Sequence, residues 1–434
     1  MSLTIAVPNT NFENFVDIIT PISFDFSKES LNNSGDISFI DKFIFLRSST
    51  ATVCNKNGIL ETVAANVPRY NYDPITKKFK GLLLEGNSIN LLPYSATFNN
   101  WVFTESSKAT AIVSPDGTAN CSKIVGSTQN SEHSFSYNIG SQVSGRLMCS
   151  IFLKKGDYDH VALSLEGFNV PIELVYKFST KSVVSRSGAV PWFEIEDASN
   201  GFIRLCFRGF ADTPVGKTNF KVSLVDDNLN KVFAGDATKG TYVWGAQFEN
   251  IGYSPSSYIP TEGTSVTRVA DECTARISGM AGKTIGMITE IEKSVLQFAV
   301  NDAYSFIPVV NIRRNNNLYL DGSLSIYIDR ASTNIVAASN FPSVTSRTNT
   351  GVSINNKKVK VCALFKNKED SISANAFNSV TSITAEKPAD LTQLRLGASA
   401  VLGGGAEYSS INIKNLRIFF IDLPASDLQK LSGI

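Results

Sequence analysis

The chain has 434 residues, of which 43% are hydrophobic and only 18% are charged. Its 40 Lys and Arg residues balance 39 Asp and Glu residues, so the formal net charge is +1. This composition excludes an intrinsically disordered chain. It also lacks the basic footprint of a nucleic-acid-binding protein and the polybasic patch of a membrane-surface protein. The two histidines are too few for a metal site built from several imidazoles.

The amino terminus has neither the cationic nor the apolar segment of a secretory signal peptide. No apolar run approaches the roughly 20 residues that a membrane-spanning helix requires. The six cysteines are scattered without a C-x-x-C motif, which is typical of small buried hydrophobic residues in a reducing compartment. We therefore expect a soluble protein made in the cytosol, with reduced cysteines, no cofactor, no metal and no membrane insertion.

Residues 1–66 begin with an irregular stretch rich in Asn and Phe. They also contain the turn Asn55-Lys56-Asn57-Gly58, whose Asn-Gly pair predicts a tight hairpin. Further along the chain, short runs alternate apolar and polar residues and are bounded by Gly, Asn, Asp or Pro. These runs are 147–155, 160–166, 172–178, 202–208, 220–225 and 242–248.

Helical spacing of apolar residues is almost absent. The pattern predicts a mainly β fold of tandem antiparallel β-sandwiches, or jelly rolls. We divide the chain into an irregular segment at 1–66, a sandwich at 67–271 and a second sandwich at 272–434. A connector rich in Pro, Gly, Ser and Thr spans 252–265. The last residues predict one short helix over 423–431, with Ser426 as its N-cap and Gly433 beyond its end.

Two passages carry more than general β information. The first covers 47–95 and contains RSSTAT (47–52), NVPRY (66–70), YDP (72–74), GLLLE (81–85) and NLL (90–92). The second contains YVWGAQFE (242–249), PSSYIPT (255–261) and TRVAD (267–271). Together they resemble segments of structural proteins of tailed bacteriophages, namely tail-fibre and head-spike-fibre proteins. In those proteins the second passage looks like the last strand of a carbohydrate-binding-module-like jelly roll and its exit linker.

The carboxyl-terminal block has a looser likeness to concanavalin/laminin-G-like sandwiches. Residues 359–365 and 371–377 resemble the hairpin that precedes the Leu-Arg-Leu-Gly strand of that fold, here 394–397. Because lectins and structural proteins share this sandwich, the fold alone does not assign a ligand.

The phage resemblance implies a virion protein that is assembled in the cytoplasm of the host bacterium. It implies that residues 1–66 anchor the chain to other virion proteins, that the chain forms a homo-oligomer, commonly a trimer, and that the sandwiches contact host surface glycan. On this interpretation the chain is not an enzyme. Two alternatives stay open: a polysaccharide-degrading tailspike-type enzyme, and a decorative or connecting particle protein without a ligand.

Aromatic rings are the candidate glycan-binding residues, because sugar rings stack on Trp and Tyr faces. Trp101, Trp192, Tyr253 and Tyr258 lie near turns or Pro-containing segments, where a ring can be exposed. Trp244, in contrast, shares a strand face with Tyr242 and Phe248, so we expect it in the core.

Glu194 and Glu196 are the strongest candidates for a glycan-cleaving carboxylate pair, because they lie two residues apart on one strand face. We favour the simpler interpretation that both alternate outward while Phe193 and Ile195 face the core. The acidic turns 226–228 and 271–272 lack the spacing of a calcium loop and are interpreted as solvated. No catalytic or metal-binding residue is therefore predicted.

Overall fold

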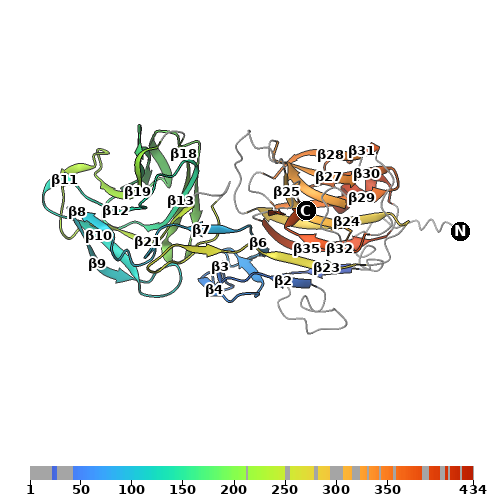
Figure 1. Cartoon of the computed structure of the whole chain (residues 1–434), viewed down its shortest axis with the longest axis horizontal. Coiled ribbons are helices and arrows are strands. Elements are labelled where there is room, and N and C mark those ends of the chain that lie inside the picture. The colour runs from blue at the N-terminus through green and yellow to red at the C-terminus, as the bar shows by residue number, and fades with distance from the viewer. Residues whose placement is uncertain are drawn as a thin grey trace.

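The computed structural model describes residues 22–26, 43–211, 214–249, 255–277, 282–293, 306–314, 323–329, 332–341, 344–354, 358–383, 391–400, 406–408, 411–420 and 423–433. Within these ranges the fold is mainly β, with multiple antiparallel sheets and a short carboxyl-terminal helix, which confirms the predicted fold class. The strands form two lobes that lie end to end, joined by a band of short strands (Figure 1).

The first lobe is a sandwich of two six-stranded sheets. One sheet has the order β17-β18-β13-β21-β10-β9. Its strands are β9 (Ser106–Ile112), β10 (Cys121–Gly126), β13 (Gly145–Lys154), β17 (Trp192–Asp197), β18 (Ile203–Ala211) and β21 (Gly240–Glu249). The other sheet has the order β16-β15-β14-β19-β12-β8. Its strands are β8 (Val102–Thr104), β12 (Ser134–Asn138), β14 (His160–Phe168), β15 (Ile172–Lys177), β16 (Ser182–Ser187) and β19 (Pro214–Val225).

The core of the first sandwich lies between these two sheets. Leu147 and Ile151 of β13 belong to the same buried cluster as Leu163 and Leu165 of β14. On the opposite face of β21, Trp244 is buried against Phe152 and Tyr258, with ring centroids 5.3 and 4.8 Å away. Trp244 is buried, as predicted, but it does not share a face with Phe248, which lies in the cluster between the two sheets. The register of β21 against β13 shifts between Trp244 and Gln247, so the two rings face opposite sides. The short strands β11 (Asn130–Glu132) and β20 (Val232–Ala234) pair beside this sandwich.

The second lobe is a sandwich of an eight-stranded and a seven-stranded sheet. The larger sheet has the order β31-β30-β29-β24-β35-β6-β5, with β1 also paired to β35. Its strands are β1 (Ile22–Asp25), β5 (Arg69–Tyr72), β6 (Phe79–Leu84), β24 (Ile285–Lys293), β29 (Lys358–Lys366), β30 (Glu369–Ala374), β31 (Val380–Ile383) and β35 (Ile411–Phe419). The facing sheet has the order β2-β23-β32-β25-β26-β27-β28. Its strands are β2 (Phe43–Leu46), β23 (Glu272–Arg276), β25 (Phe306–Arg313), β26 (Ser323–Asp329), β27 (Asn334–Phe341), β28 (Val344–Ser353) and β32 (Gln393–Leu396).

Strands from both ends of the sequence complete the second sandwich. Leu82 and Leu84 of β6 lie in the same core cluster as Ile413 of β35, and Leu82 pairs with Ile413 in register. Gly81 permits this close approach: its φ is +142°, and a Cβ there would lie 2.8 Å from the Ile413 backbone. β5 and β6 thus join the second sandwich, although they fall within the 67–271 range assigned to the first. The division into independent domains at those boundaries stays a prediction.

Three further short pairings complete the described strands. β3 (Ala51–Cys54) and β4 (Leu60–Val63) form the hairpin expected around Asn57-Gly58, with Gly58 at φ +80°. β7 (Ser88–Asn90) pairs with β22 (Val266–Arg268) between the lobes. The third pair is β33 (Ala398–Ala400) with β34 (Ala406–Tyr408).

The closing helix α3 spans Ala425–Leu431, so the helix is confirmed and its predicted cap is wrong. The N-cap position is Pro424, which makes no side-chain cap hydrogen bond, and Ser426 lies inside the helix. Proline is compatible with this end because it lacks the backbone N–H that a first turn leaves unpaired.

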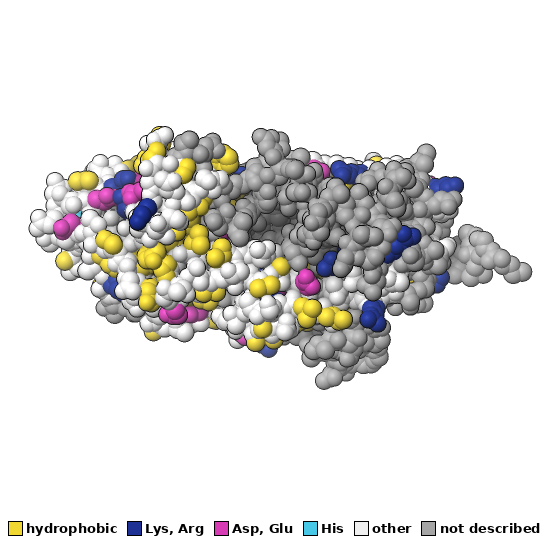
Figure 2. All heavy atoms as spheres, in the orientation of Figure 1, with side chains coloured by type: hydrophobic (Ala, Val, Ile, Leu, Met, Phe, Trp, Pro, Cys, Tyr) yellow, Lys and Arg dark blue, Asp and Glu magenta, His cyan; other side chains and the backbone are white. Residues whose placement is uncertain are grey.

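No described helix has the length and apolar character needed to cross a membrane. Charged side chains of both signs are scattered over the face shown in Figure 2.

Candidate functional site

A cleft of about 510 Å³ lies where the two lobes meet. β17 and β18 of the first sandwich provide one wall, and β5, β6 and β24 of the second provide the other. The β3–β4 hairpin and the connector after β21 add the remaining lining. The polar and charged lining side chains include Asn71, Asp73, Thr76, Lys80, Glu85, Glu194, Glu196, Asp197, Ser199, Arg204, Ser256, Ser257 and Glu292.

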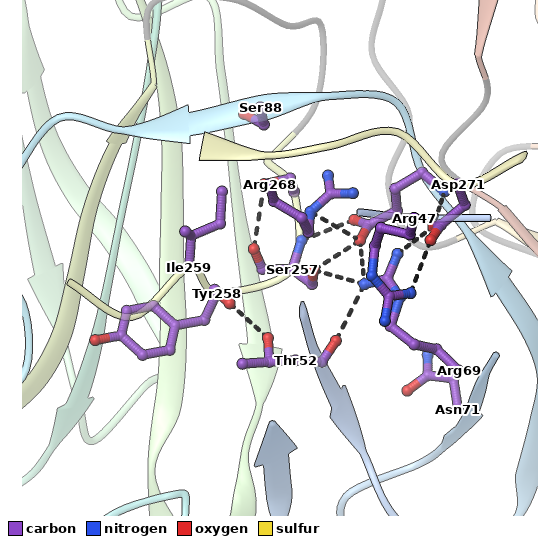
Figure 3. Close-up of polar contacts among 12 residues, drawn as sticks. Arg47, Thr52, Arg69, Asn71, Ser88, Ser257, Tyr258, Ile259, Arg268 and Asp271 are labelled. Atoms are coloured by element: carbon purple, nitrogen blue, oxygen red, sulfur yellow. Dashed lines mark hydrogen bonds and ion pairs between the residues drawn. The ribbon is translucent and has the colours of Figure 1, made fainter. Parts of the chain in front are cut away.

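A buried network of charges forms the joint beneath this cleft. Arg69 pairs with Glu85 at 2.6 Å and also with Asp271, which in turn pairs with Arg47 at 3.0 Å. The exposed fractions of these four side chains are between 0 and 4%. Figure 3 shows the side chains of Arg47, Arg69 and Asp271 turned toward one another, with Arg268 and Ser257 beside them. Every carboxylate of the joint is therefore matched by a guanidinium, as a buried charge requires.

The connector after β21 supplies hydrogen bonds to the same network. The backbone N–H of Ser257 donates to Glu85 Oε1 at 2.7 Å, and its hydroxyl donates to Glu85 Oε2 at 2.6 Å. Burial alone would raise the pKa of Glu85, but Arg268, Arg69 and these hydrogen bonds hold it well below its usual value. Glu85 is consequently ionised at neutral pH.

The two sequence passages at 47–95 and 242–271 meet at this joint. Arg47, Arg69 and Glu85 come from the first passage, and Ser257 and Asp271 come from the second. Farther along β7, Asn90 Nδ2 donates to the carbonyls of Ala246 and Ile259, at 3.0 and 2.9 Å. Residues of these two passages therefore build the connection between the two sandwiches.

Asp271 corrects the prediction that the 271–272 turn is solvated. Its side chain has no exposed surface, and Oδ2 accepts the backbone N–H of Glu85 at 2.8 Å. The sequence did not reveal this role because its partners Arg47 and Arg69 lie more than 200 positions away. The other acidic turn is exposed: Asp226 accepts the backbone N–H groups of Asn228 and Asn230 in its own loop.

Glu194 and Glu196 line the cleft, while Phe193 and Ile195 pack against the core of the first sandwich. The predicted alternation is confirmed, but the outward face of β17 is the cleft wall rather than open surface. Glu196 Oε2 lies 3.9 Å from Arg204 Nη1 on the neighbouring strand.

Arg204 is held firmly in this wall. Its Nη2 and Nε donate to Ser150 Oγ at 2.8 and 3.2 Å, and its guanidinium lies 5.5 Å from the Phe152 ring centroid. Burial would lower the pKa of Arg204, but neighbouring groups, among them Cys206 and Glu196, raise it overall. The guanidinium of Arg204 is thus held in place by Ser150 and lies next to Glu196.

The opposite wall carries Asp73 and the Lys80–Glu292 pair. Asp73 Oδ1 accepts the backbone N–H groups of Ile75 and Thr76 at 3.0 and 2.7 Å, which shapes the turn after β5. Burial would raise the pKa of Asp73, but the hydrogen bonds from Thr76 and Ile75 lower it overall. Lys80 Nζ lies 3.4 Å from Glu292 Oε1. Both walls therefore present carboxylate oxygens, which accept hydrogen bonds from hydroxyl groups.

Of the predicted glycan-binding aromatics, Tyr258 lines this cleft, whereas Trp101 and Trp192 do not. Trp101 is 5% exposed, and its indole N–H donates to the Pro93 carbonyl within an aromatic cluster. Trp192 is buried with Met148 and Cys206. Tyr258 is 2% exposed, and its hydroxyl lies 2.6 Å from Ser95 Oγ. Tyr253 lies outside the described residues. The three described rings are thus largely buried, and their role in glycan binding stays a prediction.

Tyr137 is an aromatic residue that sequence inspection missed. It lies half-buried in a second pocket of about 480 Å³, together with Pro93, Ile139, Gln142 and Thr264. This pocket, at one end of the first sandwich, has no charged lining residue. Its position depends on the packing of separate loops, so no local pattern indicated it. Within the part of the chain that the structure describes, no group of three or more His, Cys, Asp or Glu residues is placed to hold a metal ion.

Neither a protein-family model nor a curated protein matches this sequence. Among solved structures, the chain is similar to the CBM40 module of Ruminococcus gnavus IT-sialidase bound to α2,3-sialyllactose (12% identity, 36% of this chain and 84% of that chain, TM-score 0.28). It is also similar to domains LG4-5 of the mouse laminin α1 chain (11% identity, 69% and 90%, TM-score 0.24). A third similar structure is Trypanosoma rangeli sialidase in complex with sialic acid (9% identity, 76% and 63%, TM-score 0.27). At these scores the likenesses assign neither a ligand nor an activity to this chain.

The prediction that the chain is not an enzyme is corrected by these comparisons. The similar structures include Trypanosoma rangeli sialidase and a mutant of it that displays trans-sialidase activity. We therefore withdraw that prediction, while a likeness at about 10% identity assigns neither activity to this chain.

Proposed function

We propose that this chain is a structural protein of a tailed-bacteriophage particle and that its inter-lobe cleft contacts glycan on the host surface. One observation carries the proposal: the two passages that resemble such phage proteins form a single buried joint, which fixes two sandwiches around a cleft lined with hydrogen-bond acceptors. A rigid joint of this kind suits a protein that works by shape and placement. Weak sugar contacts summed over many copies would raise avidity by about 10² or more.

In this proposal the protein resides in the virion after assembly in the host cytoplasm. The part of residues 1–66 that precedes β2 attaches it to other virion proteins, and it assembles as a trimer. β2 itself belongs to the second sandwich, and the β3–β4 hairpin lines the cleft. Immunogold electron microscopy of purified particles tests the location, with antibody raised against the full chain. Labelling of the capsid or the tail is the expected result, and unlabelled particles would overturn the proposal. Mass photometry of the purified chain tests the trimer.

Glycan contact has its own test, a glycan array probed with the assembled protein. Binding that is lost when excess free glycan competes supports the proposal. A flat profile at all concentrations would instead indicate a decorative or connecting particle protein without a ligand.

A second candidate function is cleavage of a polysaccharide, favoured by the position of Glu194 and Glu196 in the wall of the cleft. Successive same-face residues of a strand lie about 6.6 Å apart, which is close to the carboxylate separations used by glycoside hydrolases. Release of reducing ends from host capsule or lipopolysaccharide measures this activity. Activity that is abolished in both Glu194→Gln and Glu196→Gln would support the enzyme, and activity retained in both would exclude this pair.

A further inference from the structure

We infer that the cleft selects glycan segments without carboxylate or sulfate groups and disfavours acidic polysaccharides. This inference rests on the proposed glycan contact and deepens it by naming the chemical class of the ligand. It follows from the charges that line the cleft and from how its two cations are already engaged.

Acidic residues outnumber basic ones around the cleft. Asp73, Glu85, Glu194, Glu196, Asp197 and Glu292 are the acidic members, and Lys80 and Arg204 are the basic ones. Cations lie beside most of these carboxylates: Arg69 beside Glu85, Arg204 beside Glu196, Lys80 beside Glu292 and Lys181 beside Asp197. Asp73 adds a negative charge whose Oδ1 accepts backbone N–H groups of its own turn. An acidic sugar that entered would therefore meet Asp73 and two lining cations that already have carboxylate partners.

Neither lining cation is free to receive an anionic sugar. Arg204 donates to Ser150, faces Glu196 and has a side chain only 9% exposed. Lys80 is paired with Glu292 at 3.4 Å. An incoming carboxylate would have to break one of these contacts and leave a carboxylate of the protein without its partner, which is costly in a partly buried site.

Uncharged sugars, in contrast, fit the chemistry of both walls. Their hydroxyl groups donate hydrogen bonds, and carboxylates such as Asp73 accept them more strongly than neutral oxygens do. Tyr72 and Ile75, which also line the cleft, offer apolar surface to the C–H groups of a sugar ring. The same carboxylates would attract the ammonium group of an unacetylated amino sugar.

The experiment compares neutral and acidic glycans on the full-length assembled protein at low salt. An array of neutral hexose and N-acetylhexosamine oligomers, together with uronate- and sialate-containing oligomers, identifies the strongest neutral binder. That oligosaccharide and its C6-oxidised form, in which hydroxymethyl groups become carboxylates, are then titrated by calorimetry. We expect the oxidised form to bind at least tenfold more weakly and the difference to shrink at 0.5 M NaCl, because salt screens the repulsion.

Variants assign the selectivity to the cleft. Glu196→Gln and Glu194→Gln should each reduce the difference in affinity between the neutral oligosaccharide and its oxidised form. Asp227→Asn is the matched control: it removes one negative charge from a side chain that is 92% exposed and outside the cleft lining, so the gap should stay unchanged. Thermal unfolding of each variant confirms that it is folded.

Each outcome decides between the two claims. Stronger binding of acidic glycans would overturn the inference and leave glycan contact standing. Neutral binding that is indifferent to Glu194→Gln and Glu196→Gln but lost in Tyr137→Ala would move the site to the uncharged pocket and also overturn the inference. Absence of binding to every glycan would overturn the proposed glycan contact itself.

Discussion

Replacing Asp271 by Asn tests whether the buried joint holds the two lobes together. The substitution keeps the size of the side chain but removes the charge that pairs with Arg47 at 3.0 Å and with Arg69. Arg69 retains Glu85, whereas Arg47 loses its carboxylate partner at a position with no exposed side-chain surface. Breaking a buried ion pair from one side costs about 3–5 kcal/mol, because the remaining charge stays buried.

Urea denaturation, followed by circular dichroism, measures the free energy of unfolding of Asp271→Asn. Asp197→Asn is the control, since its partner Lys181 lies at a similar distance of 3.1 Å but the two side chains are 56% and 65% exposed. The control should lose no more than about 1 kcal/mol. A loss below about 1 kcal/mol for Asp271→Asn, or a loss equal to that of the control, would refute the view that burial makes this network important for stability.

Three further predictions concern single positions. The pKa of Glu85 in the folded protein lies well below its ordinary value of 4.5. The stability that ionised Glu85 contributes is therefore present above pH 4.5 and is lost as the pH falls below that value. Urea titrations from pH 7 to 3 should show a steeper decline in the free energy of unfolding for the wild type than for Glu85→Gln. Gly81→Ala should destabilise the protein more than Gly140→Ala, because both have positive φ but only the former brings a Cβ within 2.8 Å of the β35 backbone; equal melting temperatures would contradict this. Burial raises the pKa of Cys54 to about 12. At pH 8 iodoacetamide should therefore modify Cys54 about 10³-fold more slowly than a thiol whose pKa is the usual 9.0. Rapid modification of Cys54 in the folded protein, mapped by mass spectrometry, would contradict this prediction.

Local features of the sequence predicted the local features of the fold. The period-two runs at 160–166 and 172–178 became the paired strands β14 and β15. These predictions succeed because alternation and turn residues act over a few positions. The pairing of β6 with β35, more than 300 positions later, leaves no such trace, so the sheet membership of 69–84 was not predicted.

The site was predicted less well for the same reason. Glu194 and Glu196 were identified by their spacing, but the cleft they face is formed by β5 and β6 of the other lobe. Trp101 and Tyr258 were expected near the surface because turns or prolines flank them, yet large aromatic rings beside turns also close the ends of a sandwich core. Whether a residue is buried depends on which distant segments pack over it. The residues next to it in the sequence do not carry that information.

The interleaved second sandwich imposes an order on biosynthesis. The ribosome synthesises β5 and β6 more than 300 residues before β35, the strand that pairs with β6. The first sandwich, whose strands are contiguous between 102 and 249, can fold in the interval, whereas β6 has β5 on one edge and lacks β35 on the other. Truncated chains that stop before residue 411 lack β35 and would therefore expose one edge of β6. We expect such chains to aggregate in the cell rather than to persist as shorter soluble proteins.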